Sequence, residues 1–158
     1  MMNARLIGIA QYGVAEAPET LCCLGLGSCV AVFLHDPVAK KGGVVHVLLP
    51  KSPKGHPPDA KYADTGIRLL LEKLVSCGAD RNRLQAKLVG GAKMFSDLSL
   101  RMSDIGRENV VQSRKTLAEL GIRIVAQEIE GTKGRSAYYS TEDGSITVKT
   151  AFSNDRRI

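Results

Sequence analysis

Cys29 and His46 are the two side chains whose chemical types point most directly to catalysis. Cys29 follows Gly25-Leu26-Gly27-Ser28, and such a glycine-containing run allows backbone N–H groups to come close to a bound substrate. A cysteine thiol has a pKa of about 8.5, which a neighbouring imidazolium can lower to roughly 3.5–7.5. Cys29 beside an imidazole would therefore be a thiolate nucleophile.

The chain has three histidines, of which His46 is the strongest partner for that thiol. It lies between Val44-Val45 and Val47-Leu48-Leu49, where a buried imidazole that finds no polar partner costs about 1–3 kcal/mol. His35 precedes a predicted turn and His56 lies among prolines, so we expect both of them to be exposed to water.

The residue types alone are also compatible with purely structural roles for Cys29 and His46. Cysteine is often buried as a small apolar side chain, and a lone strand histidine is often a hydrogen-bonded structural residue. A simple hairpin that turns near Ala39 would place His46 opposite a residue near Phe33, with Cys29 several residues farther along the ladder. Spacing alone does not bring the two side chains together.

The cysteines do not predict a metal site or any other cofactor. Structural zinc sites use paired Cys-x2–4-Cys spacings, and Cys22, Cys23 and Cys29 do not form such a pattern. The glycine pairs at Gly90-Gly91 and residues 131–134 lack the Lys-Ser/Thr ending of a phosphate-binding loop, so we interpret them as turns. A thiol-based redox sensor is a further hypothesis, although no resolving pair with obvious spacing is visible.

Hydrophobic periodicity and turn residues predict strands that alternate with two helices. We expect strands at residues 5–12, 20–24, 29–35, 43–49, 84–89 and 122–129, and a final hairpin from 137–139 and 146–148. One helix should follow a cap at Asp59 and end at Gly78, and a second should follow a cap at Ser103 or Asp104 and end at Gly121. Residues 51–58 contain three prolines and should form a loop. These elements predict an α/β fold in which a mainly antiparallel sheet system is covered by two helices.

Length and composition favour a single water-soluble domain over residues 1–158. The chain is 44% hydrophobic and 24% charged, which is typical of globular proteins. Its longest apolar runs fall short of the roughly 20 residues of a membrane span, and its N-terminus does not resemble an export signal, so we expect a cytoplasmic protein with free thiols. The net charge of +6 is spread along the chain with few aromatic residues, which argues against nucleic-acid binding.

Several motifs resemble the CheD family of chemoreceptor glutamine deamidases. The most specific are Gly25-Leu26-Gly27-Ser28-Cys29-Val30 and His46-Val47-Leu48-Leu49-Pro50. Further matches, in the same order as in the family, are Lys61-Tyr62-Ala63-Asp64, Gly90-Gly91-Ala92-Lys93-Met94, Ile105-Gly106-Arg107-Glu108-Asn109 and residues 131–135. The resemblance extends over residues 6–148.

The resemblance implies an α/β layered sandwich similar to the catalytic domain of the deamidating cytotoxic necrotizing toxins. It also implies that Cys29 and His46 form a catalytic dyad, without a cofactor or metal, and that the partners are methyl-accepting chemoreceptors and the CheC phosphatase. The family usually has a threonine six residues before the cysteine as third site residue, where this chain has Cys23. A thiol is a weaker hydrogen-bonding group than a hydroxyl, so Cys23 would orient His46 less firmly.

The implied reaction is acyl transfer from a glutamine side chain to Cys29, with backbone N–H groups of Ser28 and Cys29 stabilising the oxyanion. Hydrolysis of glutamyl methyl esters at the same site is an extension of this hypothesis. The alternative is a non-catalytic docking module that binds CheC or chemoreceptors, and Cys23 is the residue that favours it.

Overall fold

The computed structural model describes residues 3–94 and 104–158 of the chain. The strands are β1 (Arg5–Leu6), β2 (Tyr12–Glu16), β3 (Thr20–Leu26), β4 (Val30–Asp36), β5 (Lys41–Val47), β6 (Gln85–Gly90), β7 (Arg123–Ile129), β8 (Arg135–Ser140), β9 (Ile146–Thr150) and β10 (Arg156–Arg157). The helices are α1 (Ala63–Ser76), α2 (Ile105–Leu120) and the short 3₁₀ helix η1 (Arg81–Arg83).

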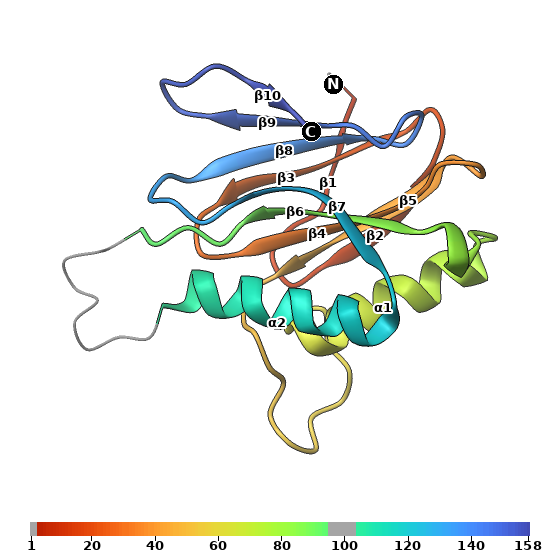
Figure 1. Ribbon diagram of the computed structural model, residues 1–158, viewed down its shortest axis with the longest axis horizontal. Coiled ribbons are helices and arrows are strands. Elements are labelled where there is room, and N and C mark those ends of the chain that lie inside the picture. The colour runs from red at the N-terminus through yellow and green to blue at the C-terminus, as the bar shows by residue number, and fades with distance from the viewer. Residues whose placement is uncertain (1–2, 95–103) are drawn as a thin grey trace.

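These elements form three layers, with helices α1 and α2 packed on an inner sheet and an outer sheet on the far side of it (Figure 1). The inner sheet has the strand order β2-β5-β4-β6-β7, and the outer sheet has the order β1-β3-β8-β9-β10. Strand β1 pairs with β3, and β6 with β7, in parallel, whereas the other described pairs are antiparallel. The predicted α/β class, a mainly antiparallel sheet system with two covering helices, is confirmed. No helix among the described residues is long and apolar enough to span a lipid bilayer.

Strand β4 lies at the centre of the inner sheet and is buried on both faces, as its continuous apolar run indicates. Val30, Val32 and Leu34 belong to the core beneath the helices. Ala31 and Phe33 alternate with them and belong to the core between the two sheets. The face of β4 toward the outer sheet is the one on which the candidate site is built.

The helices begin and end largely at the expected residues. Asp104 caps α2 by accepting a hydrogen bond from the Arg107 N–H at 3.1 Å, and Gly121 ends that helix with a φ of 72°. Ser103, the other predicted cap, lies outside the described residues. The predicted cap of the first helix at Asp59 is wrong: α1 follows Tyr62, and the Asp59 carboxylate instead accepts from the Lys61 N–H.

Two predictions for the strands are also wrong. Residues 5–12 do not form one strand, because the chain turns after β1 and enters β2 of the other sheet at Tyr12. In the β4–β5 hairpin the turn is centred earlier than expected, since Asp36 pairs with Lys41 and its carboxylate accepts hydrogen bonds from the N–H groups of Val38 and Ala39. The partner of His46 is therefore two residues closer to Cys29 than the simple hairpin predicted.

Candidate active site

The register between β4 and β5 brings Cys29 and His46 to neighbouring positions. His46 pairs with Ala31, and Val47 pairs with Val30, the residue after Cys29. Cys29 and Ala31 belong to the same core between the sheets, so Cys29 lies on the face of the inner sheet that carries Ala31 and His46. Cys29 and His46 are thus diagonal neighbours across the ladder, a relationship that separates Cα atoms by about 7–8 Å.

The imidazole of His46 is held by the backbone of the N-terminal segment. Its Nδ1 lies 3.1 Å from the carbonyl oxygen of Ile7. Because a carbonyl only accepts hydrogen bonds, Nδ1 carries a proton and donates it, which leaves Nε2 of the neutral ring with a lone pair. Nε2 is buried and has no hydrogen-bond partner among the described residues.

The backbone of His46 is anchored to the same segment. The Ala10 N–H donates to the His46 carbonyl, and the His46 N–H donates to the Gln11 carbonyl, each at 2.9 Å. The ring and the strand that carries it are therefore positioned together by the N-terminal segment.

Burial favours the uncharged forms of both side chains. Cys29 is 6% exposed and His46 is 2% exposed. Desolvation raises the pKa of the Cys29 thiol, and the backbone N–H of Cys29 lowers it by a smaller amount. Desolvation lowers the pKa of His46, and the hydrogen bond to Ile7 partly offsets this. These directions oppose the sequence prediction of a resting thiolate and favour a neutral thiol beside a neutral imidazole.

Cys23 lies on β3 of the outer sheet, fully buried in the core that also contains Cys29. Burial, with smaller effects of Cys22 and Cys29, holds the pKa of the Cys23 thiol well above its usual range. Within residues 3–94 and 104–158 no hydrogen bond joins Cys23 to His46, whose Nδ1 is occupied by the Ile7 carbonyl. An orienting role for Cys23 stays a prediction. The four cysteines are free thiols, as expected.

The loop after β6 closes against the peptide backbone at Cys29. The Gly91 N–H donates to the Cys29 carbonyl and the Ala92 N–H to the Gly27 carbonyl, both at 2.8 Å. Gly90 has a φ of 115°, and a Cβ there would lie 2.3 Å from the Cys29 carbonyl oxygen. Glycine is required at this position because the two backbones approach so closely.

A second loop, at residues 131–135, lies beside the first. The Lys93 N–H donates to the Gly131 carbonyl at 2.8 Å. Arg135 is buried, and its guanidinium donates to the carbonyls of Glu128 and Glu130, which fixes the path of the loop. Both loops therefore lie beside the run that leads to Cys29. Gly90 is the last residue of β6, and residues 131–134 lie in the connection from β7 to β8.

Cys29 itself is buried, but residues next to it reach the surface. The preceding residues Gly27 and Ser28 are half-buried and Gly25 is exposed. Met94 is exposed as well, and its side chain lies against Gly27. The surface next to Cys29 is thus formed by the glycine-containing run and the end of the loop after β6.

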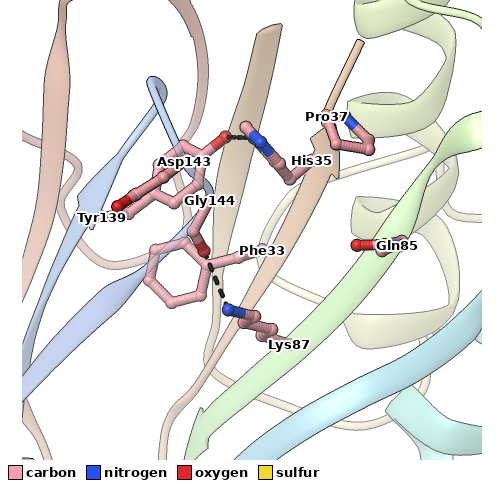
Figure 2. A pocket seen from close by; sticks show the side chains of 8 residues that line it. All are labelled: Phe33, His35, Pro37, Gln85, Lys87, Tyr139, Asp143 and Gly144. Atoms are coloured by element: carbon pink, nitrogen blue, oxygen red, sulfur yellow. Dashed lines mark hydrogen bonds between the residues drawn. The ribbon is translucent and has the colours of Figure 1, made fainter. Parts of the chain in front are cut away.

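A small cavity at the other end of β4 is separate from this site (Figure 2). It has a volume of about 50 Å³, which is room for water. Nδ1 of His35 and the hydroxyl of Tyr139 lie 2.5 Å apart on one side of it, and Lys87 Nζ donates to the Gly144 carbonyl at 2.9 Å on the other. His35 is six positions along the chain from Cys29, a distance of about 20 Å in an extended strand.

The structure corrects one histidine prediction and confirms another. His35 is buried rather than exposed, because the β8–β9 turn covers it: a Cβ on Gly144 would lie 2.5 Å from the His35 ring. His56 is exposed in the proline-containing loop, as expected.

Sequence reasoning missed two groups that position the site. The Ile7 carbonyl that binds His46 is a backbone group, so the residue type at position 7 does not predict the contact. Asn109 is fully buried and donates to the carbonyls of Ser28 and Leu48. The sequence does contain an indication of this role for Asn109. A side-chain amide next to Val110, on the inner face of a predicted helix, requires a polar partner.

The molecule is a layered α/β protein in which Cys29 and His46 lie diagonally across one ladder of the inner sheet, an arrangement compatible with a cysteine hydrolase. The family described as CheD chemotactic sensory transduction matches residues 48–150. The chain is 42% identical over 145 residues to the chemoreceptor glutamine deamidase CheD of Thermotoga maritima, covering 92% of this chain and 90% of that protein. It is 41% identical over 156 residues to the protein of the same name from Halalkalibacterium halodurans, covering 96% of each. The chain belongs to the CheD family.

Proposed function

We propose that this protein is a chemoreceptor glutamine deamidase that converts glutamine side chains of methyl-accepting chemoreceptors to glutamate. The observation that carries the proposal is the diagonal placement of Cys29 and His46, with Nδ1 of His46 bound to the Ile7 carbonyl and Nε2 without a partner in the described part of the chain. An imidazole with an unprotonated Nε2, placed diagonally to a neutral thiol across the ladder, has the two groups that a general base and its nucleophile require.

In the first half of the reaction, Cys29 attacks the side-chain amide carbon of the glutamine. His46 Nε2 takes the thiol proton as the C–S bond forms, so no resting thiolate is needed. The resulting imidazolium gives its proton to the amide nitrogen, the C–N bond breaks, and ammonia leaves a thioester on Cys29.

The oxyanion of the tetrahedral intermediate is stabilised by the backbone N–H groups of Ser28 and Cys29. Neither N–H donates to another group of the described residues, so both are available to a substrate oxygen. Donors that are fixed before the reaction cost no reorganisation when charge develops.

In the second half, His46 accepts a proton from water as the water oxygen attacks the thioester carbon. The C–S bond breaks, the thiol regains its proton, and glutamate is released. Hydrolysis of glutamyl methyl esters follows the same course with methanol as the leaving group, and we propose it as a second activity of the site.

Three further expectations accompany this proposal. They are a fold shared with the catalytic domain of the deamidating cytotoxic necrotizing toxins, an interaction with CheC, and a cytoplasmic location. Each stays a prediction. Nucleic acid is not an expected partner, because basic residues are spread along the chain rather than clustered.

Mass spectrometry of a chemoreceptor fragment incubated with the protein tests the proposed function. We expect glutamine-to-glutamate conversion with the wild-type chain and with Cys77→Ala, which removes an exposed thiol far along the sequence from the site. Conversion should be lost with Cys29→Ala. Conversion that survives this change would refute the proposal.

A docking module is the second candidate, and the burial of both side chains is the observation that favours it. A module of this kind would bind receptors or CheC without chemistry. Receptor binding that is unchanged by Cys29→Ala, with no conversion by the wild-type chain, is the result that would support it.

A further inference from the structure

Asn109 joins the two halves of the candidate site through a single side chain. It lies in the first turns of α2, is fully buried, and its Nδ2 lies 2.9 Å from the Ser28 carbonyl oxygen and 3.0 Å from the Leu48 carbonyl oxygen. One acceptor immediately precedes Cys29 and the other follows His46 by two residues. Because both acceptors are carbonyls, the amide nitrogen rather than Oδ1 must face them.

The Ser28 carbonyl belongs to the same peptide unit as the Cys29 N–H. The C=O and N–H of a trans peptide are coplanar and point in opposite directions. Fixing the carbonyl from the side of α2 therefore fixes the Cys29 N–H on the side away from this helix. That N–H is one of the two proposed oxyanion donors, and it also lies close enough to its own sulfur to affect the thiol.

Glycines allow α2 to come close enough for this contact. A Cβ on Gly106 would lie 2.4 Å from the Ala92 carbonyl oxygen and 2.6 Å from that of Gly91, so the helix packs directly on the loop after β6. This close packing sets the position of Asn109, one helical turn later. The Oδ1 atom of Asn109 is buried without a hydrogen-bond partner among the described residues, so the two contacts of Nδ2 account for the side chain's role.

We propose that Asn109 is a positioning residue that aims the Cys29 N–H at the substrate oxyanion and ties this peptide to the strand of His46. The proposal rests on the proposed deamidase function and deepens it. It differs from a purely structural role, because an oxyanion donor matters for attack on a carbonyl and not for attack of the same sulfur on an alkyl halide.

Two reactions of Cys29 separate these roles. In a Cys77→Ser background, deamidation of a receptor fragment measures the step that needs the oxyanion donor. Alkylation by iodoacetamide, followed at Cys29 by peptide mapping, measures the sulfur alone. Asn109→Asp keeps the shape of the side chain and removes both N–H donors, and Asn109→Ala removes the amide without adding an oxygen.

The control is Ser113→Ala, in the next turn of α2. Ser113 is buried like Asn109, and its hydroxyl has no partner within the described part of the chain, so its removal should leave both reactions unchanged. All variants are compared at a temperature at which circular dichroism shows them folded.

We expect Asn109→Asp and Asn109→Ala to lower kcat for deamidation by about 10²-fold, with KM and the alkylation rate of Cys29 within about threefold of the control. A kcat within about threefold of the control would overturn the proposal, and so would an alkylation rate that falls in parallel with kcat. Loss of folding in both variants at every temperature would also overturn it, since Asn109 would then be a structural residue. The proposed function fails separately, if Cys29→Ala retains activity.

Discussion

Nδ1 of His46 and the backbone carbonyl oxygen of Ile7 form a hydrogen bond of 3.1 Å, although the two residues are 39 positions apart in the sequence. This contact decides which ring nitrogen carries the proton, and hence that the free nitrogen is Nε2. A backbone group therefore orients the proposed base in this chain, where the family resemblance would assign the task to a side chain at position 23.

The first prediction concerns that orienting contact. Deletion of residues 1–7 removes the Ile7 carbonyl, so the ring loses its fixed tautomer and deamidation should slow by about 10²-fold or more. Deletion of residues 1–3 leaves β1 and Ile7 in place and is the matched control. Equal activity of the two truncated proteins, both shown to be folded by circular dichroism, would contradict the role given to Ile7.

The second prediction concerns Cys23. Because Nδ1 of His46 already has a partner, replacing Cys23 by the threonine usual in the family should change kcat by less than about threefold. Steady-state deamidation kinetics of Cys23→Thr provide the measurement. An increase in kcat of tenfold or more, which is on the order of one strong hydrogen bond, would contradict this prediction. The side chain at position 23 would then limit the rate of the wild-type protein.

The third prediction is the pH dependence of activity. Burial lowers the pKa of His46 below its ordinary value of 6.5 and raises that of the Cys29 thiol above 9.0. The neutral imidazole is the active base, so kcat/KM should stay constant from about pH 9 down to about pH 6.5 and fall only below that value, as His46 is protonated. If Cys29 and His46 instead formed a thiolate–imidazolium pair before the substrate binds, kcat/KM would fall at alkaline pH, because the imidazolium would lose its proton.

The fourth prediction concerns stability. Burial lowers the pKa of both His35 and His46, so the unfolded chain takes up protons near pH 6.5 while the folded chain does so only at lower pH. The free energy of unfolding should therefore fall as the pH falls below about 6.5. Urea unfolding at several pH values measures this dependence, and His35→Gln should make it shallower. A slope that is the same with and without His35 would contradict this account.

The fifth prediction concerns Gly106 in α2. In an ordinary helix interior, replacing glycine by alanine stabilises by about 0.5–1 kcal/mol. Here the new Cβ would lie 2.4 Å from the Ala92 carbonyl oxygen, a backbone atom, so Gly106→Ala should instead destabilise by about 1–3 kcal/mol. Thermal unfolding measures the sign. As a benchmark, Ala118→Gly at an exposed position of the same helix should cost about 1 kcal/mol.

The strands and helices were largely predictable because their apolar periodicity and caps are local signals. The beginning and end of α2 were predicted correctly from Asp104 and Gly121, and β4 was predicted from its continuous apolar run. The turn after β1 was not predictable in this way, because residues 5–12 read as one apolar strand although they enter two different sheets. The burial of His35 depends on the β8–β9 turn, which lies more than 100 residues away.

The site was predictable in its residue types but not in its geometry. Cys29 and His46 stood out because a thiol after glycines and an imidazole in an apolar strand need an explanation. Their proximity depends on the register of the β4–β5 hairpin. Because the Asp36 carboxylate accepts hydrogen bonds from N–H groups of the turn, the turn is centred earlier than expected, and His46 pairs with Ala31 rather than with a residue near Phe33. Such a shift cannot be derived from composition or spacing, since several turn lengths suit the same residues.

In the proposed mechanism Cys29 and His46 act as one catalytic unit. The most direct measurement is the rate of receptor glutamine conversion for Cys29→Ser, His46→Gln and the double variant, each shown to be folded. We predict that each single change lowers the rate by about 10³-fold or more and that the double variant is no slower than the slower single variant. Two losses that multiply in the double variant would contradict the claim, because the two side chains would then contribute independently.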